Sequence, residues 1–89
     1  MHVNIRLFAR LKEVVGASEL QRVVPDGCAA ADAWNALVAE FPALADHTRS
    51  VSCAVNEEYA RLTAPLHDGD EIAFLPPVSG GSGRRSDTG

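Results

Sequence analysis

Apolar and polar residues alternate along residues 2–8 of the chain. Val3, Ile5 and Leu7 share one side of this alternation, and Phe8 falls on the other side. Successive side chains of a strand point to opposite faces of its sheet, so a period of two predicts a strand with one buried face. We therefore expect the first three side chains in the core and Phe8 on the outward face.

A short helix and a second strand are predicted next. Apolar residues recur at helical spacing over residues 9–15, and Gly16 follows where a left-handed cap suits the end of a helix. Residues 19–24 are predicted to form a strand. The sequence Pro25-Asp26-Gly27 ends it, because proline fixes φ and glycine tolerates a positive φ in a turn.

The main helix is predicted over residues 29–41. Its apolar residues recur at i, i+3, i+4 and i+7 and form one stripe, which consists of Trp34, Leu37, Val38 and Phe41. Asp32, near the start, suits the positive end of the helix dipole. An aromatic residue inside such a stripe usually packs in the core, so we expect Trp34 to be buried rather than to bind a partner.

Shorter elements are predicted after Pro42, which stops the helix. We expect little regular structure over residues 43–50. Strands are expected over residues 52–56 and 71–75, with a turn at 57–58, a short edge segment at 59–61 and a loop at 62–70. In the last strand the alternation places Ile72 and Phe74 on one side and Leu75 on the other.

This order of elements favours an α+β fold in which a mixed sheet packs on one main helix. A hairpin of the first two strands, a crossover through the helix and later strands added to the sheet satisfy the preference for short, right-handed connections. That arrangement is the β-grasp, or ubiquitin-like, fold. A split βαβ ferredoxin-like fold competes with it, because element order is only weakly diagnostic. We expect a domain over residues 1–75, a flexible arm over 76–81 and a disordered extension over 82–89.

Length and charge narrow the functions open to the chain. A chain of 89 residues forms one small domain, in which a roomy enclosed active site is not expected. The net charge of −4 makes nucleic acid a poor partner. No apolar run approaches the roughly 18 residues of a membrane span, and residues 1–6 lack the features of a signal peptide. We therefore expect a cytoplasmic protein with no membrane partner.

No metal site or catalytic group is predicted. Cys28 and Cys53 are too far apart to form a CxxC pair, and no histidine stands at metal-ligand spacing from either one. We expect structural thiols, scattered histidines without a metal, and no bound cofactor. The spacing of serine, histidine and aspartate residues also gives no triad, which indicates a chain without a catalytic constellation of its own.

The chemistry is expected in the segment after the last predicted strand. It reads Pro76-Pro77-Val78-Ser79-Gly80-Gly81, in which the prolines end the sheet and favour an extended path. Six extended residues reach at most about 20 Å. Two successive glycines pass through a channel too narrow for any Cβ, so this arm suits insertion into another protein's active site. Composition alone also fits a disordered Gly/Ser-rich tail.

The run from Leu66 to Gly81 resembles the C-terminal signature of the molybdopterin synthase small subunits, within the wider MoaD/ThiS family of sulfur carriers. It reads LHDGDEIAFLPPVSGG, and its residue types, order and spacing are similar to the family signature. The resemblance extends to Leu7-Phe8-Ala9, residues 11–16 and Ala54-Val55-Asn56, and so covers residues 1–81. The helix region matches only in its pattern of apolar residues.

The resemblance implies that Gly81 delivers sulfur, with Gly80 beside it. An ATP-dependent adenylyltransferase related to ubiquitin-activating enzymes would adenylate the Gly81 carboxylate, and a sulfurtransferase would supply the sulfur that makes a thiocarboxylate. The synthase large subunit would then accept the arm and pass the sulfur to cyclic pyranopterin monophosphate. The resemblance also implies a heterotetramer of two small and two large subunits, with the catalytic side chains on the large subunit.

The family docks through an apolar patch on the sheet face away from the helix. By position the matching residues here are Phe8, Tyr59 and Leu75, flanked by the arm residues Pro76, Pro77, Val78 and Ser79. The alternation described above independently places Phe8 and Leu75 outward. An exposed aromatic residue beside an exposed leucine is typical of a contact surface, and a partly covered edge of the core is the other interpretation.

The chain departs from the family at residues 82–89, because the family's carriers end at the second glycine. While Gly81 is amide-bonded to Ser82, it has no carboxylate to adenylate. Three explanations stay open. A protease cuts after Gly81, the extension is the start of a fusion or a cloning remnant, or the chain has lost the sulfur chemistry and serves as a binding module.

Two other functions compete with molybdopterin synthesis. Sulfur carriers for thiamine thiazole or another thiocarboxylate pathway share the glycine end, although Phe8 and residues 76–79 favour the molybdopterin branch. A ubiquitin-like binding module or protein modifier has no sulfur chemistry, and a modifier would attach Gly81 to a lysine through an isopeptide bond.

Overall fold

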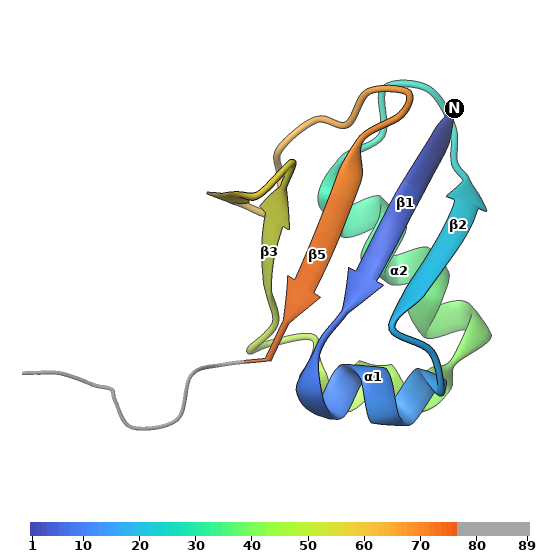
Figure 1. The fold of residues 1–89 in the computed structure, drawn as a ribbon, viewed down its shortest axis with the longest axis vertical. Helices are drawn as coiled ribbons and strands as arrows, with labels where there is room; N and C mark the ends of the chain where they lie inside the picture. Colours follow the sequence, from blue (N-terminus) through green and yellow to red (C-terminus); the bar gives the residue numbers. More distant parts are fainter. Residues whose placement is uncertain (77–89) are drawn as a thin grey trace, which may run out of the picture.

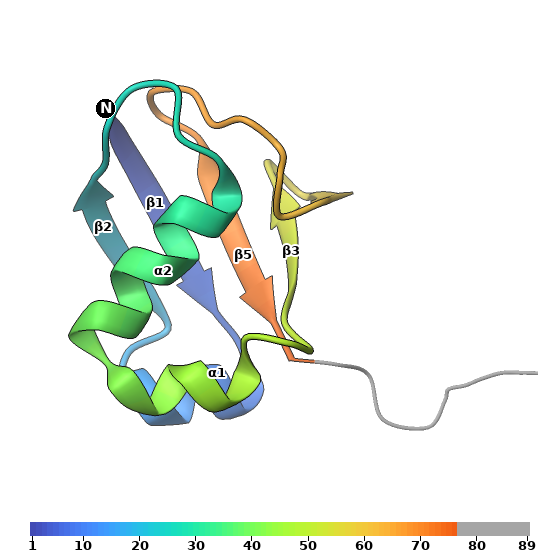
Figure 2. The ribbon, with the colours of Figure 1, turned by 180° about the vertical axis from the view of Figure 1, so that it is seen from behind.

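The computed structural model describes residues 1–76 and contains a five-stranded sheet packed on one main helix. The strands are β1 (His2–Leu7), β2 (Glu19–Val23), β3 (Ser52–Val55), β4 (Glu58–Ala60) and β5 (Glu71–Leu75). The helices are α1 (Ala9–Val15) and α2 (Ala30–Glu40), and a 3₁₀ helix, η1 (Pro42–His47), follows α2 directly. Figures 1 and 2 show α2 lying across one face of the sheet, and among the described residues the opposite face carries no helix.

The strand order is β2-β1-β5-β3-β4. Strands β1 and β5 run parallel, with Leu7 opposite Phe74, and the other neighbouring strands run antiparallel. This mixed sheet on one main helix confirms the β-grasp prediction over the ferredoxin-like alternative. Because β1 and β5 are parallel, their C-terminal ends lie at the same end of the sheet, beside α1 (Figure 1).

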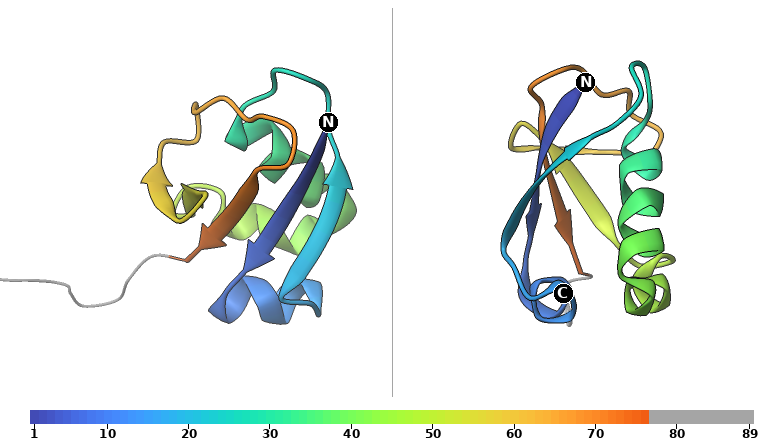
Figure 3. Two further views of the ribbon diagram at one scale, coloured as in Figure 1. Left: turned by 45° about the horizontal axis from the view of Figure 1, so that its top comes forward. Right: turned by 90° about the vertical axis from the view of Figure 1, so that its right-hand side faces the viewer.

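The core lies between the sheet and α2, and the side view in Figure 3 shows these two layers. The inward side chains predicted for β1 and β5 are at most 2% exposed, and they are Val3, Ile5, Leu7, Ile72 and Phe74. Trp34 is 1% exposed, and its ring centroid lies 5.1 Å from that of Phe74. Its indole N–H donates a hydrogen bond to Thr48 Oγ1 at 3.0 Å, so the predicted core position of Trp34 is confirmed.

The ends of both α-helices follow the sequence signals. Gly16 adopts a φ of 85°, and its N–H donates to the Lys12 carbonyl, which ends α1 as predicted. At the start of α2, the backbone N–H of Ala29 donates to Asp32 Oδ2 at 2.8 Å. The Asp32 carboxylate therefore satisfies a donor that the first turn leaves without a helical partner.

The segment after α2 is more regular than predicted. Residues 43–50 were expected to have little regular structure, yet Pro42–His47 form η1. Phe41 and Leu44 are three residues apart, which is one turn of a 3₁₀ helix. The Leu44 N–H donates to the Phe41 carbonyl at 2.9 Å, and the Leu44 side chain is fully buried. Burial of this leucine stabilises a helical turn that the apolar pattern of residues 43–50 does not indicate.

The hairpin of β3 and β4 is shifted by one residue from the prediction. The turn residues are Asn56 and Glu57 rather than 57–58, and β4 is Glu58–Ala60 rather than 59–61. Both turn residues have a positive φ, 51° and 72°, as a two-residue type I′ hairpin turn requires. Glutamate is uncommon in that conformation, so the sequence did not place the turn there.

Residues 77–89 lie outside the described residues, so most of the predicted arm and the whole predicted extension stay predictions. Pro76, the first arm residue, directly follows β5. Among residues 1–76, no helix combines the length and the apolar character needed to cross a membrane. The cytoplasmic location stays a prediction.

Candidate functional site

A shallow hollow of about 230 Å³ lies on the sheet face opposite α2, and we call it the sheet hollow. Residues of β1, β5, β3 and β4, together with the residues that adjoin them, form its lining. The lining residues are Arg6, Phe8, Ala54, Glu57, Tyr59, Glu71, Ala73 and Leu75. Segments far apart in the sequence therefore meet at one place on the open face.

The strand register explains why the sheet is hollowed there. Arg6 lies opposite Ala73, Ala73 lies opposite Ala54, and Ala54 lies opposite Tyr59. Side chains of one such row point to the same face of the sheet. The two alanine methyl groups stand between the long side chains of Arg6 and Tyr59, so the surface is lowest in the middle of the row.

Three larger apolar side chains line the hollow around these alanines. Phe8 and Leu75 each follow the last paired residues of the two strands, Leu7 and Phe74. They therefore lie at the C-terminal end of the β1–β5 pair. Phe8 is 37% exposed and Tyr59 is 80% exposed, whereas Leu75 is partly buried. Exposed aromatic rings around a concavity offer a large apolar contact area to a partner.

Charged groups border the apolar surface. The Arg6 guanidinium lies 5.4 Å from the centroid of the Phe8 ring, within range of a cation–π contact. Its Nη1 lies 3.3 Å from Glu71 Oε2, and Glu57 supplies a second carboxylate to the lining. The hollow thus has one cation and two anions, and a partner with an apolar side chain next to a basic group complements it.

Asn56 holds the β3–β4 hairpin, and with it Tyr59, against the start of β5. Its backbone N–H donates to the Glu71 carbonyl at 2.8 Å, and its Oδ1 accepts from the Glu71 N–H at 3.1 Å. Its Nδ2 donates to Asp70 Oδ1 at 3.0 Å, and the His67 N–H donates to Asp70 Oδ2 at 2.8 Å. These two hydrogen bonds lower the pKa of Asp70 below its ordinary value, and the hydrogen bond from Asn56 has the larger effect.

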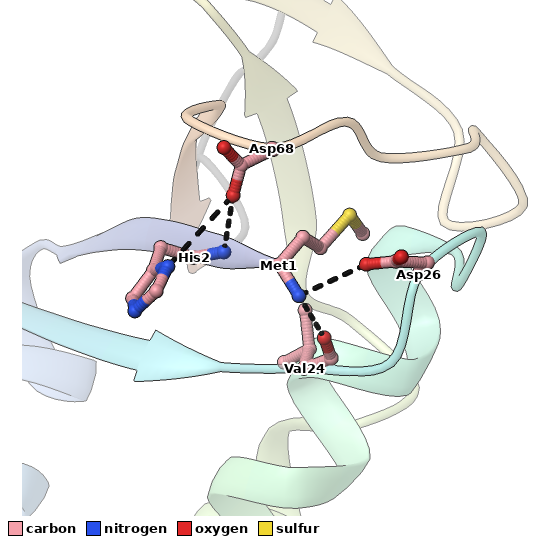
Figure 4. Close-up of polar contacts among 5 residues, drawn as sticks. All are labelled: Met1, His2, Val24, Asp26 and Asp68. Carbon is pink, nitrogen blue, oxygen red and sulfur yellow. Dashed lines mark hydrogen bonds and ion pairs between the residues drawn. The ribbon is translucent and has the colours of Figure 1, made fainter.

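Met1 and His2 fix the N-terminal end of β1 through hydrogen bonds and an ion pair (Figure 4). The Met1 amine donates to the Val24 carbonyl at 2.8 Å and lies 3.0 Å from Asp26 Oδ1. The His2 N–H donates to Asp68 Oδ1 at 2.7 Å. These contacts join β1 to the turn before α2 and to the loop before β5, at the end of the sheet away from Phe8.

The cysteines have the properties of structural thiols. Cys53 is 1% exposed with its Sγ 3.3 Å from the Ala60 carbonyl, and burial raises the pKa of its thiol. Cys28 is partly buried. Its burial raises the pKa of its thiol, and the negative charge of the nearby Asp32 carboxylate raises it further. Within residues 1–76, no group of three or more histidine, cysteine, aspartate or glutamate side chains is placed to hold a metal ion.

The structure brings Phe8, Tyr59 and Leu75 together, as the docking prediction requires, and places Pro76 directly after Leu75. The other predicted site residues, Pro77, Val78, Ser79, Gly80 and Gly81, lie outside the described residues. Sequence reasoning missed the remaining lining residues, which are Arg6, Ala54, Glu57, Glu71 and Ala73. The alternation in β1 and β5 puts Arg6, Glu71 and Ala73 on the same side as Phe8 and Leu75, so this signal could have found them.

Comparison with known proteins gives consistent matches over nearly the whole chain. The model of the ThiS family matches residues 5–81. The molybdopterin synthase sulfur carrier subunit of Arabidopsis thaliana is 36% identical over 81 residues, which cover 91% of this chain and 84% of the relative. These matches and the shared fold indicate one family.

Two solved structures extend this comparison. The crystal structure of SAMP1 from Haloferax volcanii has a TM-score of 0.77 at 34% identity, covering 91% of this chain and all of that chain. A protein–protein complex of subunits 1 and 2 of the molybdopterin-converting factor from Helicobacter pylori 26695 contains a match with a TM-score of 0.64 at 29% identity. This match covers 91% of this chain and 100% of the matched chain.

Proposed function

Because the chain belongs to the ThiS family, we propose that it is a sulfur carrier for molybdopterin synthesis, the step that prepares the organic part of the molybdenum cofactor. The observation that carries this proposal is the sheet hollow, which gathers Phe8, Tyr59 and Leu75 beside the point where the chain leaves β5. A carrier needs such a docking surface close to the arm that delivers its cargo, because docking then brings the arm to the partner's active site.

The cargo is proposed to be a sulfur atom on the carboxyl group of Gly81, in a chain from which residues 82–89 have been removed. An oxygen of that carboxylate attacks the α-phosphate of ATP in the adenylyltransferase, and pyrophosphate leaves. Hydrosulfide supplied through a sulfurtransferase then attacks the acyl carbon. The C–S bond forms, the bond from that carbon to the AMP oxygen breaks, and AMP leaves to give the thiocarboxylate. ATP belongs to the activating partner, and the carrier itself is proposed to bind no cofactor.

The carrier is proposed to dock on the large subunit of molybdopterin synthase and to donate its sulfur to cyclic pyranopterin monophosphate there. The Helicobacter pylori complex of subunits 1 and 2 supports a partner of this kind. Gly80 and Gly81 have no side chains, so the end of the arm fits a narrow channel. The catalytic side chains are proposed to lie on the large subunit, and two copies of each subunit are proposed to form a heterotetramer.

A gene deletion in the source organism tests the pathway. Cells without this chain should accumulate cyclic pyranopterin monophosphate, lose molybdenum-enzyme activity and still grow without thiamine. A copy of the gene encoding Gly81→Val should fail to restore molybdopterin, whereas one encoding Val23→Ala should restore it. Normal molybdopterin in the deletion strain would exclude the proposal, and a thiamine requirement would favour a thiazole pathway instead.

Protein modification is the second candidate function. It is favoured by the similarity to the protein from Haloferax volcanii that is named small archaeal modifier protein 1, at 37% identity over 87 residues. A modifier joins its terminal glycine to a lysine through an isopeptide bond, which a reductant does not break. Immunoblots of reduced cell extracts therefore separate the two functions, because only a modifier gives a ladder of heavier bands, and Gly81→Val should remove it.

A further inference from the structure

Glu57 brings a carboxylate to the sheet hollow from a strained backbone position. It is the second residue of the Asn56–Glu57 turn and has a φ of 72°, in the left-handed region that glycine adopts without steric cost. Backbone strain of this kind is concentrated at binding and catalytic sites, where the side chain is needed. The Glu57 side chain is exposed and lines the hollow, so the residue that strains the turn also adds a charge to the docking surface.

The charge of Glu57 is not balanced within the part of the chain that the structure describes. Arg6, the one cation in the lining, lies 3.3 Å from Glu71 Oε2 and 5.4 Å from the centroid of the Phe8 ring. Its charge is therefore offset by Glu71. Among residues 1–76, no lysine, arginine or histidine forms an ion pair with the Glu57 carboxylate. The hollow thus keeps one uncompensated negative charge, at the β3–β4 turn.

We propose that Glu57 is a specificity-determining residue of the docking surface and pairs with a lysine or arginine of the synthase large subunit. This inference rests on the proposed sulfur-carrier function. The partner then carries an apolar side chain over Ala54 and Ala73 and a basic group directed at the turn. A protein that brings a carboxylate to this position is repelled, and one that brings an uncharged group gains nothing from Glu57.

Glu58 shows that position, and not acidity alone, decides which carboxylate serves the hollow. It is as exposed as Glu57 by class, but it is the first residue of β4 and is absent from the lining of the hollow. Glu58 lies opposite Val55, which packs against the core, whereas Tyr59 lines the hollow. Because successive side chains of a strand point to opposite faces, Glu58 is directed away from the docking surface.

The exposure of Glu57 determines which step of binding it should control. A charge at the border of a contact attracts an oppositely charged partner before the surfaces meet, so it mainly raises the association rate. Dissolved salt screens exposed charges over about 10 Å at 0.1 M ionic strength. The contribution of Glu57 should therefore be largest at low ionic strength and should disappear at high ionic strength.

Binding kinetics at low and high ionic strength test the assignment. The full-length chain and the large subunit of the same organism are compared by surface plasmon resonance. Glu57→Gln keeps the size of the side chain and should lower the association rate constant about three- to tenfold at low ionic strength only. Glu58→Gln makes the same chemical change outside the hollow and should bind at the wild-type rate. Equal rates for the two variants, or a loss that persists at high ionic strength, would overturn the proposal.

Glu57→Gly separates the binding role from a role in folding. This variant loses both the carboxylate and the strain, so it should associate as slowly as Glu57→Gln yet unfold at a higher urea concentration than the wild type. Slower binding together with lower stability would assign Glu57 a structural role instead. If the wild type does not bind the large subunit at all, the carrier function fails. If the wild type and Glu57→Gln bind equally fast, the carrier function stands and the specificity role fails.

Discussion

Ala73 of β5 lies directly opposite Ala54 of β3, on the face of the sheet that α2 leaves open. Each alanine also has a long neighbour in the same row, Arg6 beside Ala73 and Tyr59 beside Ala54. A larger residue at either position would fill the space between these neighbours. The depth of the sheet hollow thus depends on two methyl groups, and the proposed docking depends on that depth.

Filling the hollow should weaken docking without unfolding the domain. Ala73→Leu should weaken binding to the synthase large subunit by about tenfold or more, because a partner side chain loses its place at the centre of the contact. The free energy of unfolding should change by less than about 1 kcal/mol, because the side chain faces outward. Titration calorimetry and urea unfolding measure the two effects. Ala36→Leu, on the exposed side of α2, is the matched control and should leave binding unchanged.

Removing the exposed rings should have a similar effect. Phe8→Ala and Tyr59→Ala should each weaken binding to the large subunit by about ten- to a hundredfold, since exposed aromatic residues at contact centres commonly dominate binding energy. Val23 is an equally suitable apolar surface residue for comparison, because it is 71% exposed but lies on β2, outside the hollow. Val23→Ala should bind normally. Equal losses for Tyr59→Ala and Val23→Ala would place the docking surface elsewhere.

Much of this site follows from the sequence, but its shape does not. The period of two in β1 and β5 correctly turned Phe8 and Leu75 outward, because that signal needs only neighbouring residues. The hollow depends on the pairing of Ala54 with Ala73, which belong to strands far apart in the chain. Alternation along one strand gives no information on which residue of another strand lies opposite, so the two alanines were not recognised.

Dependence on tertiary contacts also explains why the predictions for η1 and for the β3–β4 turn were wrong. Leu44 stands between two alanines and belongs to no helical or alternating apolar pattern, so its burial is visible only in the folded chain. Asn56 and Glu57 form a turn that usually contains glycine, and the contacts of Asn56 with Glu71 and Asp70 fix it there. These elements depend on tertiary contacts more than on local preference.

Replacing Glu57 by glycine in the Asn56–Glu57 turn should stabilise the folded domain. Glu57 has a φ of 72°, a conformation that costs a residue with a Cβ about 1–2 kcal/mol. Glu57→Gly removes that cost but increases the conformational freedom of the unfolded chain, so the net gain in unfolding free energy should be about 0.5–1 kcal/mol. Thermal and urea unfolding measure it. Gly69→Ala is the reverse control, because Gly69 has a φ of 86° and should lose stability. A less stable Glu57→Gly variant would show that the turn carries no strain.

Asp70 should make stability depend on pH in the acid range. The hydrogen bonds from Asn56 and the His67 N–H lower the pKa of Asp70 in the folded state. The stability that this carboxylate contributes is therefore fully present above its unfolded pKa and is lost as the pH falls through the lower folded pKa. His67 Nδ1, 3.7 Å from Asp70 Oδ2, is the other titratable group facing it.

Asp70→Asn measures this contribution. The variant should be less stable than the wild type at neutral pH, and the difference should shrink as the pH falls below the ordinary range of a carboxyl group. Urea unfolding from neutral to strongly acidic pH gives the comparison. Asp46→Asn, at an exposed position of η1, should follow the wild type throughout. A constant difference between Asp70→Asn and the wild type would mean that the lowered pKa does not contribute.

Two of the proposed partners, the adenylyltransferase and the synthase large subunit, should compete for one surface. The sheet hollow is a single concavity beside Pro76, and both the adenylyltransferase and the synthase large subunit must reach the same terminal glycine. We therefore expect the large subunit to displace the carrier from the adenylyltransferase in a pull-down, in proportion to its concentration. Ala73→Leu should weaken binding to both partners, whereas Ala36→Leu should weaken neither. A stable ternary complex of the carrier with both partners would show that they use separate faces. Loss of only one partner in Ala73→Leu would assign the hollow to that partner, because a shared contact cannot be blocked for one protein and left intact for the other.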